Sequence, residues 1–138
     1  MSLVAHQQIA EQVARYCYAS DSHDIEALLA VFAEEAVFEY HPAGQERPMV
    51  LAGHAALRAE LTRQWMHAIG QTRHLPSGLL VDRMDANVAR TRCMFLVTLA
   101  HEGKTRIVAT GCYVDTWEHR EPTWLLRLRE VHLDVPVR

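Results

Sequence analysis

Long segments of alternating polar and apolar residues fill the second half of the chain, and they constrain the fold more than any other feature. After a first strand segment, TRHLPSGLLVDRM, come three more long runs: NVARTRCMFLVTLAH, TRIVATGCYVDTWEH and WLLRLREVHLDV. Residues typical of turns lie at two of the junctions between these strand segments, Asp85–Asn87 and Glu102–Gly103. Long strands joined by tight turns pair as an antiparallel meander, and Pro76 favours an edge position or a bulge for its first strand.

The first half has helical spacing instead. Apolar residues at intervals of three and four predict helices from about Val4 to Ala19, from about Ile25 to Ala33, and from His54 to a stop at Gly70. AVFEY switches to a period of two and begins a strand, HPAGQERP is a loop, and MVLA is a short strand. This order is typical of an α+β fold, in which a curled sheet covered by helices leaves a conical cavity, with Gly111 permitting a bend.

The composition is that of one globular domain, residues 1–138. The formal net charge of −3 gives no electrostatic case for a nucleic-acid or membrane-surface partner. MSLVAHQQIAEQ lacks the layout of a signal peptide, and no apolar run is long enough to span a bilayer, so we expect a cytoplasmic protein. Cys17, Cys93 and Cys112 lie in apolar segments and are expected to be buried thiols.

Two carboxylates lie in the polar break SDSHD between the first two predicted helices. Asp24 directly precedes an apolar run and suits a helix N-cap. Asp21 follows Cys17 by one helical turn, on the buried side of the first helix, where a carboxylate needs a partner. We favour His74 as that partner, because it opens the first meander strand and strand alternation can turn it inward at the wide end of the cone.

An Asp–His pair of this kind can act as a general base. The carboxylate fixes the imidazole tautomer and raises the basicity of the other ring nitrogen, which suits removal of a proton from carbon next to a carbonyl or an aromatic system. Tyr16 and Tyr40 could polarise the carbonyl or protonate a leaving group. Spacing alone leaves a second interpretation open, in which Asp21 caps a helix and His74 is half-exposed.

Other kinds of site have less support. The nine histidines lack the spacing of HExxH or of paired CxxC ligands, so neither a metal nor a cofactor is expected. The sequence has no GxSxG elbow, P-loop or dinucleotide fingerprint. Trp65, Met94, Phe95 and Trp117 could line a pocket for a flat apolar ligand, although packing in the core or at a dimer face also explains them.

Four motifs in order cover nearly the whole chain: YxxxxDxxDxxxLLxxFxxxAVFEY, LAGHAAL, TRHLPSGLLVD and GCYVDTWEHREPTWLLRLREVHLD. This order resembles the SnoaL-like branch of the nuclear transport factor 2-like superfamily. The resemblance implies a cone-shaped α+β barrel, with three N-terminal helices packed on a curved, mainly antiparallel sheet, a deep pocket and a homodimer formed through the sheet. The subset that it resembles most includes scytalone dehydratase, hexachlorocyclohexane dehydrochlorinase and bile acid dehydratase, which are cofactor-free lyases with an Asp–His dyad.

The resemblance carries over residue by residue. Asp21 and His74 match the dyad, Tyr16 resembles the acid-side tyrosine of the bile acid enzyme, and Tyr40 resembles a water-positioning tyrosine of scytalone dehydratase. Where scytalone dehydratase has a second catalytic histidine, this chain reads FLVTL, and Thr98 is the nearest candidate, which we group with the pocket residues. The extra lysine of the dehydrochlorinase is missing. These matches predict a cofactor-independent lyase or isomerase acting on a small apolar cyclic or aromatic substrate.

Two other interpretations stay open. The β subunits of aromatic-ring-hydroxylating dioxygenases share this fold, a TRH segment, an FLV strand and an ending like RLREVHLD. Those subunits are mainly structural and hold no cofactor, and typical ones are longer at the N-terminus. The other interpretation is a non-catalytic small-ligand-binding or polyketide-cyclase-like protein, in which the dyad is vestigial.

Overall fold

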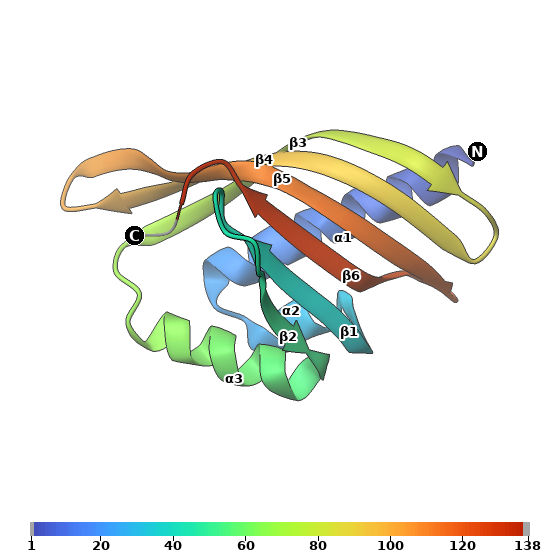
Figure 1. Ribbon diagram of the computed structural model, residues 1–138, viewed down its shortest axis with the longest axis horizontal. Helices are drawn as coiled ribbons and strands as arrows, with labels where there is room; N and C mark the ends of the chain where they lie inside the picture. The colour runs from blue at the N-terminus through green and yellow to red at the C-terminus, as the bar shows by residue number, and fades with distance from the viewer. Residues whose placement is uncertain (1, 137–138) are drawn as a thin grey trace.

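The computed structural model describes residues 2–136. Within this range the helices are α1 (Leu3–Ser22), α2 (Ile25–Leu29) and α3 (Gly53–Met66). The strands are β1 (Phe32–His41), β2 (Met49–Ala52), β3 (Gln71–Met84), β4 (Val88–His101), β5 (Lys104–Arg120) and β6 (Thr123–Leu133). The strands form a curved sheet in the order β2-β1-β6-β5-β4-β3, with α1 crossing one face and α3 beside β1 and β2 (Figure 1).

The sheet is mainly antiparallel, and the predicted meander is confirmed as β3-β4-β5-β6. The pair of β1 and β6 is parallel. The sheet stays open and does not close into a barrel, so the fold is an α+β cone with helices on its concave side. As predicted for Pro76, β3 lies at the sheet edge, and its register shifts between Ser77 and Leu80.

The boundaries of the first two helices differ from the prediction. α1 continues to Ser22, so Asp21 lies within its last turn. The N-cap role of Asp24 is confirmed, because its side chain accepts a hydrogen bond of 3.1 Å from the backbone N–H of Ala27. α2 ends at Leu29, whereas the prediction extended it to Ala33. The reason is long-range, since Phe32 already belongs to β1 and pairs with Leu126 of β6.

Aromatic side chains fill the concave side of the sheet. The ring of Phe95 stacks on that of Tyr113 with centroids 4.3 Å apart, and Tyr16 of α1 meets Tyr113 edge-on at 5.9 Å. Gly111 makes the first contact possible, because a Cβ there would lie 2.9 Å from the Phe95 ring and 2.1 Å from the carbonyl oxygen of His132. The glycine expected to permit a bend therefore also permits a close approach of ring and backbone.

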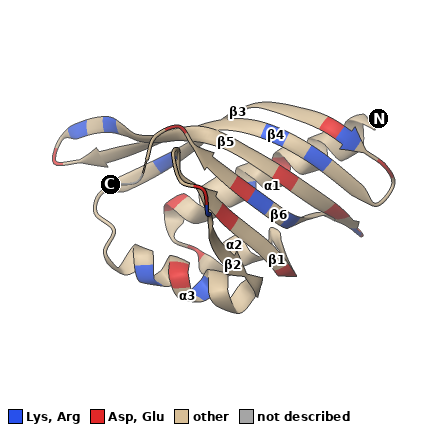
Figure 2. Ribbon diagram, in the orientation of Figure 1, with Lys and Arg blue, Asp and Glu red and all other residues tan. Residues whose placement is uncertain are grey.

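The surface carries both signs of charge. Figure 2 shows acidic and basic residues intermixed along the helices and strands. In the part of the chain that the structure describes, the helices are too short or too polar to cross a lipid bilayer.

Candidate active site

Asp21 and His74 are in direct contact. Nδ1 of His74 lies 2.6 Å from Oδ1 of Asp21, and the backbone N–H of His74 donates to Oδ2 at 2.8 Å. The hydroxyl of Thr72 donates to Oδ1 at 3.0 Å. The Asp21 side chain is only 7% exposed, so these donors replace water around its carboxylate. Because a carboxylate only accepts, Nδ1 carries the hydrogen of this contact, and in the neutral form of the ring the lone pair is on Nε2.

Local structure holds the two residues together. Asp21 follows Cys17 by one turn of α1, which puts both on the buried face of the helix. The helix then stops at His23, whose left-handed backbone (φ 55°) returns its N–H to Ala19 and Ser20. Gln71, the first residue of β3, donates to the carbonyl oxygen of Asp21 at 2.9 Å, so the end of α1 is tied to the start of β3.

The dyad opens on a depression between α1 and the edge strand β3. Its volume is about 430 Å³, within the range of small-molecule sites. The lining residues besides the dyad are Ala14, Cys17, Tyr18, Arg73, Leu75 and Pro76. The His74 side chain is 19% exposed there. This depression lies at the sheet edge and not in the centre of the cone, where the aromatic side chains described above occupy the space. A larger depression, of about 620 Å³, lies along α1 and α2 away from the dyad.

The predicted tyrosines lie at different distances from the dyad. The ring of Tyr16 stands edge-on to that of His74, with centroids 6.3 Å apart, and is 5% exposed. Tyr40 packs against Phe38 with ring centroids 4.8 Å apart and is only partly buried. Burial raises the pKa of Tyr16, and burial followed by the nearby charge of Glu60 raises the pKa of Tyr40 to about 12. Both hydroxyls therefore stay protonated near neutral pH and act as donors.

Beneath Tyr16 lies a buried ion pair that the sequence argument missed. Nε and Nη2 of Arg129 each donate to a different oxygen of Asp115 at 2.9 Å, and both side chains are fully buried. The guanidinium carbon of Arg129 lies 4.3 Å from the Tyr16 ring centroid and 3.9 Å from that of Tyr113. Burial alone lowers the pKa of Arg129, but the charge of Asp115 outweighs it, so the pKa is raised and Arg129 stays charged.

A signal for this pair was present in the sequence. Asp115 alternates in phase with Tyr113 and Trp117, and Arg129 alternates in phase with Val131. Acidic and basic residues in the buried phase of two strands that form a hairpin are candidates for pairing across it. The observed register does place Asp115 directly opposite Arg129.

The five predicted pocket residues do not gather at one place, and Trp117 is fully buried in the core. Phe95 is buried in the core, whereas Met94, its neighbour in β4, is 58% exposed on the other face of the sheet. Consecutive strand residues point to opposite faces, so the side chains of these two cannot both face the concave side of the sheet. Thr98 is partly buried farther along β4, next to a register shift after Val97. Trp65 stacks on His23 with ring centroids 5.0 Å apart, near the end of α1.

The cysteines are free thiols. Cys17 and Cys93 are buried as expected, and Cys112 is partly buried. Burial raises the pKa of Cys17, which lines the depression, to about 12. Its thiol therefore stays neutral and is poorly suited to act as a nucleophile.

The sequence pattern of the SnoaL-like domain family matches residues 1–130. No curated protein matches the chain at a significant level.

Several solved structures share the fold. Rv3472 of Mycobacterium tuberculosis, a protein of unknown function solved as an Asp-to-Asn variant, is 29% identical with a TM-score of 0.81, over 97% of this chain and 77% of that one. A provisionally assigned scytalone dehydratase of Novosphingobium aromaticivorans is 23% identical with a TM-score of 0.82, over 99% and 91% of the two chains. The β subunit of a provisionally assigned aromatic-ring-hydroxylating dioxygenase from the same organism is 19% identical with a TM-score of 0.85, over 98% and 92%.

Proposed function

The chain belongs to the SnoaL-like domain family, and on that premise we propose that it is a cofactor-independent lyase or isomerase in which His74 acts as the general base. The substrate is a small, largely apolar cyclic or aromatic compound with a carbon acid next to a carbonyl. The observation that carries the proposal is the 2.6 Å contact between Nδ1 of His74 and the buried carboxylate of Asp21. This contact leaves Nε2 of His74 as the basic atom, and His74 lines a depression large enough for a small molecule.

The proposed step is a proton transfer from carbon. Nε2 of His74 takes the proton, and the electron pair of the C–H bond moves toward the carbonyl to form an enolate. In a dehydratase the enolate then re-forms the carbonyl and expels hydroxide from the neighbouring carbon. The proton held by His74 converts this hydroxide to water, which restores the neutral base. The positive charge that develops on His74 is stabilised by Asp21, whose orientation is fixed by Thr72 and by the backbone of β3.

A protonated tyrosine would serve the acid half of this reaction. Tyr16 is the better placed of the two predicted residues, because its ring contacts that of His74, whereas the ring contact of Tyr40 is with Phe38. The charged Arg129 over the Tyr16 ring favours build-up of negative charge at that hydroxyl. We therefore assign the stabilisation of the enolate oxygen to Tyr16 first and to Tyr40 second.

Deuterium incorporation tests the reaction class without knowledge of the leaving group. A panel of small cyclic ketones and β-hydroxy ketones is incubated with the protein in D₂O, and exchange at the α-carbon is followed by NMR or mass spectrometry. His74→Ala is expected to lower the exchange rate by about 10²–10⁴-fold, the usual contribution of a general base. Asp21→Asn should cost nearly as much, because an amide cannot accept from all three donors that hold the carboxylate.

Two further variants act as controls. His67→Ala removes an exposed histidine at the end of α3 and should leave the rate unchanged. Thr72→Val removes one donor to Asp21 but keeps the contact between the dyad residues, so a smaller loss is expected. Exchange at the native rate in both His74→Ala and Asp21→Asn would refute the general-base proposal.

A second candidate function is that of a structural subunit like the dioxygenase β subunits. The observation that favours this function is the structural similarity to one such subunit, with a TM-score of 0.85 over 98% of this chain. Isolation of the chain separates the two functions. A self-sufficient lyase is stable and active by itself, whereas a β-like subunit would require co-expression with an iron–sulfur α subunit.

A further inference from the structure

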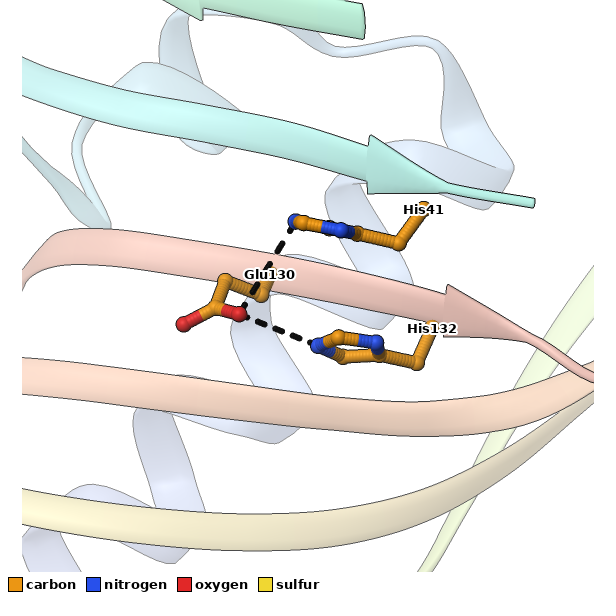
Figure 3. A group of neighbouring side chains, drawn as sticks. All are labelled: His41, Glu130 and His132. Atoms are coloured by element: carbon orange, nitrogen blue, oxygen red, sulfur yellow. Dashed lines mark hydrogen bonds and ion pairs between the residues drawn. The ribbon is translucent and has the colours of Figure 1, made fainter. Parts of the chain in front are cut away.

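Two histidines and two glutamates form a cluster on the face of the sheet turned away from the helices, and Figure 3 shows three of them. Glu39 and His41 lie on β1, and Glu130 and His132 lie on β6. The parallel register pairs Glu39 with Glu130 and His41 with His132. Residues two apart on a strand share a face, so the four side chains stand at the corners of a small rectangle. The Asp21–His74 dyad belongs to the helix-covered side.

The ligand atoms of this cluster converge. Nε2 of His132 lies 3.0 Å and Nε2 of His41 lies 3.8 Å from Oε1 of Glu130, and these three atoms all lie within 4.8 Å of one another. Nε2 of His41 is also 2.8 Å from Oε1 of Glu39. Around a tetrahedral zinc ion with bonds of about 2.0–2.1 Å, neighbouring ligand atoms are roughly 3.3–3.4 Å apart. Small side-chain rotations would therefore bring the ligand atoms of His41, His132 and Glu130 onto one ion, and Glu39 would follow through its contact with His41.

The charge of the cluster favours a cation. Two carboxylates stand directly opposite each other on neighbouring strands, an arrangement that is destabilising by itself. The side chains of Glu39 and Glu130 are only 24% and 23% exposed, so water screens their repulsion poorly. The imidazole rings of His41 and His132 stack at 4.4 Å. Both rings thus direct their Nε2 atoms to the carboxylates.

We propose that His41, His132 and Glu130, with Glu39 as the fourth ligand, bind one divalent transition-metal ion of the Zn²⁺ class. Two imidazole nitrogens and two carboxylate oxygens suit zinc, whereas Mg²⁺ and Ca²⁺ prefer oxygen ligands alone. Four protein ligands complete a tetrahedron, as in structural zinc sites. The ion would fasten β1 to β6. The sequence argument rejected a metal because it examined local spacing, and these ligands meet only through the pairing of distant strands.

Isothermal titration with ZnCl₂ tests the proposal, using the untagged full chain after treatment with a chelator. We expect one Zn²⁺ per chain, an increase in the thermal unfolding midpoint on adding Zn²⁺, and no comparable response to MgCl₂. His132→Ala is expected to lower the affinity for Zn²⁺ by at least roughly 10–100-fold, which is the usual cost of losing a residue that only supports a metal ligand. His41→Ala and Glu130→Gln should do the same, and Glu39→Gln should have a smaller effect.

The chain offers a matched control. His101 lies 3.5 Å from Glu102 in an exposed turn without a second histidine, so His101→Ala should leave zinc binding unchanged. Circular dichroism of each variant checks that it is folded, and His132, whose side chain is 43% exposed, is the variant least able to disturb packing. Zinc binding that survives His41→Ala combined with His132→Ala would overturn the proposal. Binding of one ion per two chains, or no binding, would overturn it as well.

Discussion

At the scale of single residues, the core depends on a charge that it fully buries. Arg129 is held by both oxygens of Asp115 and by the faces of two tyrosine rings. In the described part of the chain, Nη1 of Arg129 is buried without a hydrogen-bond partner. The faces of the two tyrosine rings therefore stabilise the positive charge where a hydrogen bond is missing. The pair links the interior of the sheet to Tyr16 and, through Tyr16, to the dyad.

Breaking this pair should be costly. Arg129→Met leaves the Asp115 carboxylate buried without its partner, and we expect a loss of about 3–5 kcal/mol in the free energy of unfolding. The double variant Arg129→Met with Asp115→Leu should recover most of this loss, because it removes both charges. Urea unfolding followed by circular dichroism measures both. A loss below about 1 kcal/mol in the single variant would contradict the structure of the pair.

The raised pKa of Tyr40 predicts an alkaline limit to stability. The folded-state pKa of Tyr40 is raised to about 12, above the value of about 10 in the unfolded chain. The unfolded state therefore releases its proton first, so this contribution is fully present below pH 10 and is lost as the pH rises toward 12. Thermal unfolding across this range should show a decline that is weaker in Tyr40→Phe, whereas Tyr18→Phe, at an exposed position, should follow the native profile.

The structural role of a single residue could be predicted where one local rule, such as helical spacing, determines it. Asp24 as an N-cap and Asp21 on the buried side of α1 follow from helical spacing, and both are seen. Grouping Met94 with Phe95 disregarded strand alternation, and the two side chains lie on opposite faces. Arg129 was missed because its own segment, RLREV, puts it in phase with Val131 but does not show what would pair with a charge buried there. The partner lies on another strand.

At the scale of elements, the strands were easier to predict than the boundary between α2 and β1. Phe32 continues the apolar spacing of Leu28 and Leu29, and by itself that spacing fits a longer helix. Phe32 is in a strand because it pairs with Leu126 of β6. The long strands β3, β4, β5 and β6 match their predicted ranges to within a few residues, because alternation over ten or more residues leaves little ambiguity.

A single glycine determines how β5 packs. Gly111→Ala would place a methyl group 2.1 Å from the carbonyl oxygen of His132 and 2.9 Å from the Phe95 ring, so strands β5 and β6 must move. We expect a loss of at least about 1–3 kcal/mol, the usual cost of overpacking. Gly44→Ala is the control, because nothing lies within 4 Å of its Cβ and only its backbone conformation is strained. An equal or smaller loss in Gly111→Ala, measured by urea unfolding, would contradict this interpretation.

At the scale of the whole molecule, the expected homodimer remains a prediction. The outer face of the sheet exposes Met94 and Leu75, at 58% and 49%. A homodimer formed through this face would bury them, so Met94→Glu should convert it to a monomer in light-scattering measurements coupled to gel filtration. Leu3→Glu, at a residue 87% exposed at the start of α1, should leave the mass unchanged. A native chain that elutes as a monomer would contradict the prediction.

The parallel pairing of β1 with β6 has a consequence for how the chain acquires its structure. β1 is made well before β6, the strand beside it in the sheet, because β2, α3, β3, β4 and β5 lie between them in the chain. Until then β1 has only the short β2 as a neighbour, and its other edge is open to pairing with foreign strands. Completion of the sheet thus waits for a contact of high sequence separation, which slows folding, and a nascent chain interrupted before Thr123 would be prone to aggregate.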